Sequence, residues 1–195
     1  MQRTRLADVS CSIARTLDVV GEWWTLLVVR DLALGLRRFE DLRRDLGIAS
    51  NVLVERLDTL LAAGLATREP YQFTPVRYQY TLTPKGADLV PVLYALQRWG
   101  DSWTAGDAGP PVRLRHDVCR EWTSARVTCA ACGGELRHGE VSSVPGPGLG
   151  SGRGTAVLGP LLSARAASAR VDSPPPRQSE GATSPDPAAG AAGGG

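Results

Sequence analysis

The chain has no strong excess of charge of either sign and no long apolar run. Its 195 residues carry a formal net charge of +2, which excludes a general electrostatic attraction as the main source of any nucleic-acid affinity. The longest apolar run, WWTLLVV at 23–29, is far shorter than the roughly 20 residues that cross a bilayer. The start, MQRTRLADVSC, is polar and lacks the apolar core of a secretory signal. We therefore expect a cytoplasmic protein with no membrane partner.

Side chains that usually carry out catalysis are also scarce. The chain has only two histidines, His116 and His138, and both follow the region with regular apolar periodicity. The sequence shows no paired carboxylates in a plausible cleft, no phosphate-binding glycine loop and no Ser–His arrangement. We therefore do not expect an enzyme.

Aromatic residues are absent after Trp122. Residues 145–195 are rich in Gly, Pro, Ala and Ser, a composition that cannot bury enough apolar surface to offset the entropy of ordering the chain. We expect a disordered tail there. One domain over residues 8–105 and a small appendage over 114–142 remain.

The segment from Phe39 to Thr83 has the pattern of two helices followed by a hairpin. FEDLRRDLG (39–47) is amphipathic, and Gly47 is placed to end it in a left-handed conformation. SNVLVERLDTLLAAG (50–64) repeats leucine at helical steps and also ends in glycine, while Ser50 or Asn51 can cap its first N–H groups. LATREPY and RYQYTLT read as strands, with Pro75 in the loop between them.

This order predicts a helix-turn-helix with a β-hairpin wing, so the fold class is mainly α with a small β-hairpin wing (α+β). A helix supported by a second helix, with a hairpin beside it, is the geometry that places one helix in the DNA major groove. The cations are almost all arginine, in the modest clusters Arg37/Arg38 and Arg43/Arg44 and singly at Arg56, Arg68 and Arg77.

Helical patterns flank this unit on both sides. Residues 11–20 and 22–34 precede it, and 84–103 follow it with Pro84 at the first helical position and a kink expected at Pro91. Trp23 and Trp24 are interpreted as core anchors, with a ligand pocket as the alternative. The last helix carries more apolar surface than one small domain can hide, so we expect a homodimer face shared with residues 5–20.

The motifs together resemble one family. CSIARTLDVVGEWWTLLVVRDL (11–32), GLRRFEDLRR (35–44), LVERLDTLLAAGL (53–65) and RYQYTLTPKG (77–86) are similar to the HxlR-type regulators, a bacterial branch of winged helix-turn-helix proteins akin to the MarR type. The resemblance covers about residues 8–105. It implies a homodimeric transcriptional regulator that binds double-stranded DNA and dimerises through its terminal helices.

The expected DNA contacts lie on the two helices and the wing. The set is Arg43, Arg44, Ser50, Asn51, Val54, Glu55, Arg56 and Arg77. The chain departs from the family at Trp23, where a lysine is usual, and at Ser50-Asn51-Val52, where a basic start is common. Asn51 can bond adenine instead. The alternative is a winged-helix module for protein contacts without specific DNA binding, which the near-neutral charge favours.

Cys11 stands at the start of the first predicted helix, one turn before Arg15. A helix N-terminus and a nearby cation both favour thiolate. The resemblance implies that a cysteine here senses oxidants or electrophiles, so an oxidant or small-molecule effector is one expectation and an inert thiol is the other.

The appendage contains two half-sites, His116-x-x-Cys119 and Cys129-x-x-Cys132-Gly133. This spacing is typical of a tetrahedral zinc knuckle, with His138 as the substitute for His116. The expected metal ligands are therefore His116, Cys119, Cys129 and Cys132, around a structural zinc. A reduced, metal-free pair and a disulfide stay open as alternatives. The DNA-binding domain itself requires no cofactor.

Overall fold

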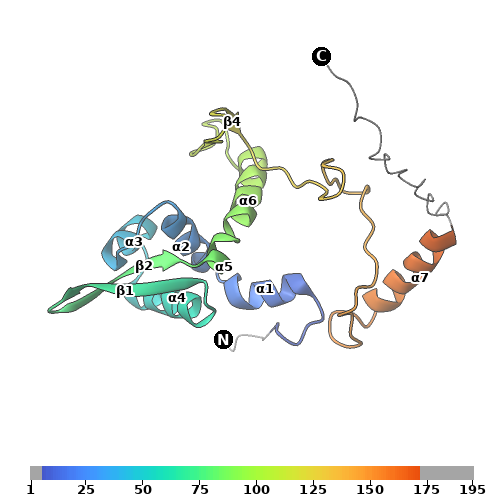
Figure 1. Ribbon diagram of the computed structural model, residues 1–195, viewed down its shortest axis with the longest axis horizontal. Helices are drawn as coiled ribbons and strands as arrows, with labels where there is room; N and C mark the ends of the chain where they lie inside the picture. Colours follow the sequence, from blue (N-terminus) through green and yellow to red (C-terminus); the bar gives the residue numbers. More distant parts are fainter. Residues whose placement is uncertain (1–5, 172–195) are drawn as a thin grey trace, which may run out of the picture.

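The computed structural model of the protein describes residues 6–171 (Figure 1). The elements are, in order, α1 (Ser12–Val20), α2 (Trp23–Ala33), α3 (Phe39–Leu46), α4 (Ser50–Ala62), β1 (Ala66–Phe73), β2 (Val76–Leu82), α5 (Pro84–Ala87), α6 (Val90–Trp103), β3 (Leu114–Arg115), β4 (Trp122–Thr123) and α7 (Leu158–Val171). The described part thus contains several helices and two antiparallel hairpins, β1–β2 and β3–β4. The helix-rich winged fold expected from the sequence is confirmed.

The predicted helix-turn-helix is present as α3 and α4. Gly47 ends α3 in the left-handed region at φ 63°, and Gly64 follows α4 at φ 66°. One detail of the prediction is wrong: the N-cap of α4 is Ala49, and it makes no side-chain cap hydrogen bond. Ser50 and Asn51 lie inside the first turn instead, because the helix starts one residue earlier than a Ser50 cap requires.

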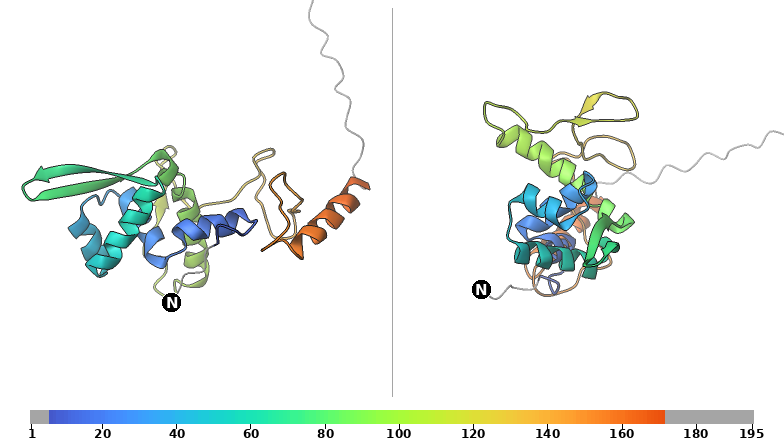
Figure 2. Two further views of the ribbon diagram at one scale, coloured as in Figure 1. Left: turned by 90° about the horizontal axis from the view of Figure 1, so that it is seen from below. Right: turned by 90° about the vertical axis from the view of Figure 1, so that its left-hand side faces the viewer.

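The wing is the β1–β2 hairpin, which projects from the helical body (Figures 1 and 2). The register pairs Ala66 with Leu82 at the base and Phe73 with Val76 at the tip, so Pro75 lies in the connecting loop as predicted. A third segment joins the base. Arg38 forms an isolated bridge with Gln79, and the N–H of Tyr80 donates to the Arg37 carbonyl at 2.8 Å.

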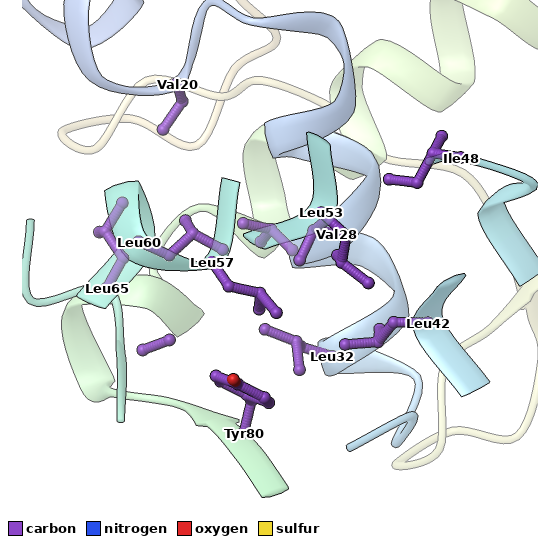
Figure 3. Close-up of a cluster of buried hydrophobic side chains, with 12 residues drawn as sticks. Val20, Val28, Leu32, Leu42, Ile48, Leu53, Leu57, Leu60, Leu65 and Tyr80 are labelled. Carbon is purple, nitrogen blue, oxygen red and sulfur yellow. The ribbon is translucent and has the colours of Figure 1, made fainter. Parts of the chain in front are cut away.

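The core lies between α2, α4 and the base of the wing (Figure 3). Its buried members are Val20, Val28, Val29, Leu32, Leu42, Ile48, Leu53, Leu57, Leu60, Leu65, Ala66 and Tyr80. Trp24 packs against this cluster, but Trp23 is 86% exposed. The core interpretation was therefore correct for Trp24 and wrong for Trp23, because Trp24 lies one helical turn before Val28 and Trp23 faces away from that side.

The expected single kinked helix at 84–103 is two helices. α5 ends at Ala87 and α6 begins at Val90. Pro91 has no N–H to donate and its ring clashes with the carbonyl four residues earlier, which is Ala87, so the break falls at that residue. Thr83 caps α5 by accepting a hydrogen bond from the Gly86 N–H at 3.1 Å. A Cβ at Gly86 would meet the Leu65 carbonyl oxygen at 2.0 Å, which requires glycine at this crossing.

The prediction of disorder over 145–195 is wrong for part of that range, because α7 occupies Leu158–Val171. Its sequence, LGPLLSARAASARV, is rich in the helix formers Ala, Leu and Arg, a local signal that the bulk composition of the tail hid. The loop before α7 contacts the N-terminal segment, where the Ser10 N–H donates to the Arg153 carbonyl at 3.2 Å. Residues 172–195 lie outside the described residues. Within 6–171 no helix is both long enough and apolar enough to cross a membrane.

Candidate nucleic-acid interface

The outward face of α4 carries most of the predicted base contacts. Ser50 and Asn51 are exposed in its first turn. Val54 and Glu55 follow on the same outward side. Val54 is 47% exposed, and the side chain of Glu55 is 70% exposed. These four predicted residues therefore share one accessible helix face. The face is polar to acidic, since Asp58 is exposed one turn further on.

Arg56 does not belong to that face. Its side chain is only 7% exposed, and its Nη1 lies 3.7 Å from the Glu22 Oε2 at the start of α2. Its Nη2 also pairs with Glu55. Arg56 thus ties α4 to α2 and cannot reach a groove, which corrects the expected contact set. The signal was available in the sequence, because a residue three positions after Leu53 lies on the buried side of the helix.

α3 contributes the two adjacent arginines that were expected at the DNA backbone. Arg43 and Arg44 are both exposed. Arg43 donates from Nε to the Glu40 Oε2 at 3.1 Å, an exposed pair one turn apart. Such a pair contributes little to stability, so a phosphate can replace Glu40 as the partner of Arg43 at small cost.

Three further arginines lie on or beside the wing, of which only Arg77 belongs to the contact set expected from the sequence. Arg77 is exposed near the tip of the hairpin. Arg38 stacks over the Tyr71 ring at 4.7 Å from its centroid, and Arg68 stacks over the Tyr78 ring at 4.6 Å. The first pair depends on the bridge that brings Arg38 to the hairpin, and the second depends on the strand register. Both contacts place a guanidinium group against an aromatic ring of the hairpin.

The C-terminal end of α4 is fastened to the base of the wing. Lys85 donates from Nζ to the Ala63 carbonyl at 2.7 Å, and the Thr83 hydroxyl donates to the Gly64 carbonyl at 2.7 Å. A cation at a helix C-terminus also interacts favourably with the helix dipole. The core side of the wing is fixed by Tyr80, whose pKa is raised by burial. These contacts hold the C-terminal end of α4 against the base of the wing.

Cys11 is the N-cap of α1, is half-buried and carries a free thiol. It accepts, through its carbonyl, the N–H of Arg15 at 3.0 Å. The structure thus places the predicted sensor residue at the helix start, as expected. Its chemical role stays a prediction.

The appendage forms two separate half-sites. The His116 Nδ1 lies 3.2 Å from the Cys119 Sγ. In the second half-site the N–H groups of Cys132 and Ala131 are directed at the Cys129 sulfur and lower the pKa of its thiol. In the described range, 6–171, no group of three or more His, Cys, Asp or Glu side chains converges as a metal site. The structure therefore pairs the four expected ligands two by two.

These features define a winged helix-turn-helix protein of the DNA-binding kind, in which α4 is the recognition helix and β1–β2 the wing. The family model for the HxlR-like helix-turn-helix matches residues 19–108. Rv3095 of Mycobacterium tuberculosis, described as an uncharacterized HTH-type transcriptional regulator, is 43% identical over 138 residues, which cover 71% of this chain and 87% of that protein. The chain belongs to the HxlR-like helix-turn-helix family of transcriptional regulators.

Two solved structures agree with this assignment. The crystal structure of PA1607, a candidate transcription factor, superposes with a TM-score of 0.62 at 33% identity and covers 69% of this chain and 94% of that one. PA1374 from Pseudomonas aeruginosa, also a candidate transcription factor, gives 0.53 at 37% identity, covering 75% of this chain and all of that one. Both likenesses extend past residue 108 of the family match, since they cover more of the chain than the winged domain alone.

Proposed function

We propose that the protein is a homodimeric regulator that binds a two-fold symmetric DNA site, with α4 in the major groove and the arginines of α3 and the wing on phosphates. The observation that carries this proposal is an apolar stripe on α6. Val92, Leu96, Trp99 and Trp103 recur at steps of four, three and four residues, which places them on one helix face. Their exposed fractions are 49%, 51%, 61% and 74%.

Such a stripe is costly to leave in water. Each large apolar side chain that becomes buried contributes about 1.5–3 kcal/mol. No residue of α6 is buried in the single chain. Its other side is already used, because Leu93 packs against the core and Gln97 donates to the Val112 carbonyl at 2.9 Å. The stripe is therefore the side of α6 that a second copy can cover.

Other helices of the domain also expose apolar side chains. Ile13 and Leu17, one turn apart on α1, are 72% and 45% exposed. A hollow of about 550 Å³ between α2 and α6 is lined by exposed Trp23 and by Leu96 of the stripe. An extended apolar surface of this kind fits an isologous interface in which both copies use the same residues.

A dimer also suits the weak charge of each unit. The first turn of α4 has no side-chain cap, so its N–H groups are available to a phosphate. Asn51 is placed to bond adenine, and Arg43, Arg44 and Arg77 are placed to reach phosphates. With so few cations per copy, two linked units give the affinity that one lacks.

The proposal is tested by breaking the stripe. We expect Trp99→Asp to sediment as a folded monomer and to bind operator DNA at least about tenfold more weakly, because two half-sites no longer act together. Val157→Asp is the matched control, since Val157 is 82% exposed outside the stripe, and it should remain dimeric. A wild-type protein that is monomeric at micromolar concentration would contradict the proposal. DNA binding without salt dependence would favour the protein-contact module.

We further propose that Cys11 makes the regulator responsive to oxidants. Support comes from its position, half-buried at the start of the helix that carries Ile13 and Leu17. Oxidation there would disturb the end of the dimer surface. Diamide should weaken DNA binding of the wild type and leave Cys11→Ser unchanged. Equal binding by both proteins, with and without diamide, would refute the sensor role.

A further inference from the structure

The two half-sites of the appendage have the same backbone. In the first, the His116 N–H donates to the Glu121 carbonyl at 2.9 Å and the Arg120 N–H donates to the His116 carbonyl at 2.6 Å. In the second, the Cys129 N–H donates to the Gly134 carbonyl at 2.7 Å and the Gly133 N–H donates to the Cys129 carbonyl at 2.8 Å. Each loop therefore repeats the same two hydrogen bonds at the same spacing.

The left-handed residue also recurs at the same place. Gly133 follows Cys132 at φ 73°, and Arg120 follows Cys119 at φ 64°. Arg120 is the one non-glycine residue with positive φ in the described range. A residue with a Cβ disfavours this region by about 1–2 kcal/mol, so the first loop keeps the shape of the second against its own residue preference.

Each loop stands at the tip of a short hairpin. β3 and β4 hold the first, with Leu114 paired to Thr123 and Arg115 to Trp122. The Thr128–Glu135 bridge and the bond from the Leu136 N–H to the Val127 carbonyl, at 2.9 Å, hold the second. Residues 124–126 join the hairpins without regular structure, and Val127 already belongs to the second hairpin.

We propose that the two loops close on a single Zn²⁺ ion, bound by His116, Cys119, Cys129 and Cys132. The spacing within the first half-site already suits this, because ligands on a tetrahedral zinc at about 2.0–2.3 Å lie about 3.6 Å apart, and the His116 Nδ1 is 3.2 Å from the Cys119 Sγ. Three sulfurs and one imidazole leave no open coordination position, as in structural rather than catalytic sites. Binding deprotonates three thiols and releases three protons, with no change of oxidation state.

The site would also anchor the appendage to α6. Glu135, next to the second loop, pairs with Arg98 of α6 at 3.2 Å. It also pairs with Arg126 and Arg137 of its own hairpin, at 3.3 Å and 3.2 Å. The segment before the first hairpin is attached to α6 by the hydrogen bond from the Gln97 side chain to the Val112 carbonyl. An ion bound by both loops would join the two hairpins, and each hairpin has its own contact with α6.

The test is the metal content of the full-length protein. We expect about one zinc per chain after purification, and a Co²⁺-substituted protein with the visible absorption of tetrahedral cobalt and thiolate-to-cobalt charge transfer. Cys129→Ser and Cys132→Ser should each lose the metal, and His116→Ala should bind it at least about tenfold more weakly. Cys11→Ser and His138→Ala are the matched controls and should keep one equivalent.

Several outcomes would overturn the proposal. One is a wild-type protein that retains no zinc and, once reduced, gives no cobalt spectrum on titration. Another is a ratio of one metal per two chains. A third is a Cys129–Cys132 disulfide in protein purified without reductant. Loss of metal in His138→Ala with retention in His116→Ala would overturn the assignment of the fourth ligand. The cobalt titration uses the wild type, so misfolding of a variant does not affect it, and circular dichroism checks that each variant keeps the winged domain.

Discussion

Arg56 and Glu22 join the recognition helix to the start of α2, with the Arg56 Nη1 3.7 Å from the Glu22 Oε2. The pair is one-sided, because Arg56 is buried while the Glu22 side chain is 45% exposed. The Nε and Nη1 atoms of Arg56 are also buried without a hydrogen-bond acceptor. A buried polar group in this state costs about 1–3 kcal/mol.

We therefore expect Arg56→Met to be at least as stable as the wild type, because an apolar chain of similar length removes that cost and keeps the packing. Arg56→Ala should lose about 1–3 kcal/mol through the missing volume. Urea unfolding measures both. The salt dependence of DNA binding should be the same in Arg56→Met as in the wild type, and a slope lowered by about one unit would return Arg56 to the interface.

Arg77 should behave in the opposite way. Because it is exposed near the wing tip, Arg77→Ala should leave stability within about 0.5 kcal/mol of the wild type. It should weaken binding to all DNA sequences about equally and flatten the salt slope by about one unit. Fluorescence anisotropy over a range of salt concentrations measures this. Arg165→Ala, an exposed arginine on α7, is the control, and equal slopes for the two variants would remove Arg77 from the contact set.

Substitutions at the left-handed residue of each appendage loop should change stability in opposite directions. Arg120→Gly should stabilise the first loop by up to about 1 kcal/mol, because glycine takes positive φ without the steric cost. Gly133→Ala should destabilise the second by about 1 kcal/mol for the same reason. A Cβ at Gly133 would have open space around it, so the effect is conformational rather than a clash. Competition for zinc against a chelator reads both changes, and a shift of the same sign in both variants would contradict the shared geometry.

The buried carboxyl of Asp31 should make the stability of the protein depend on pH. Burial raises the pKa of its carboxyl above 3.8, against the opposing effect of Arg30. The folded state then holds the proton more tightly than the unfolded state, so this group's contribution to stability is present at low pH and is lost as pH rises through the folded pKa. Asp31→Asn should therefore exceed the wild type in stability at neutral pH, with the difference shrinking as pH approaches 3.8. Urea midpoints across this range measure the difference, with exposed Asp88→Asn as the control; a gap that widens toward acid would be the wrong sign.

Local patterns were sufficient to predict the helix-turn-helix and the wing from sequence. Helical spacing of leucines and the glycines after each helix located α3 and α4, because helix ends leave such marks on short stretches of chain. The incorrect predictions concern which face of a helix a residue occupies and whether a proline bends or ends a helix. Arg56 is a residue type that favours the surface, but it lies three positions after Leu53 and therefore on the buried side of α4. Pro91 separates α5 from α6, where the apolar pattern alone predicts one bent helix.

The stacking of arginines on tyrosines and the shared backbone of the two half-sites could not be predicted from the sequence. Arg68 and Tyr78 meet across two strands, so only the register brings them together. The spacing of the Cys and His residues predicted two half-sites but not that they share a backbone. That likeness depends on Arg120 taking a conformation that its residue type disfavours, which no propensity scale would assign.

We propose that two copies of this chain read one symmetric DNA site through α4 and the wing. Selection of bound sequences from a random DNA pool with the full-length protein tests it most directly. We expect enrichment of an inverted repeat whose half-sites lie about one helical turn apart, with loss of the repeat in Trp99→Asp. A pool that shows no enriched motif, at a salt concentration where the protein is folded and dimeric, would contradict it.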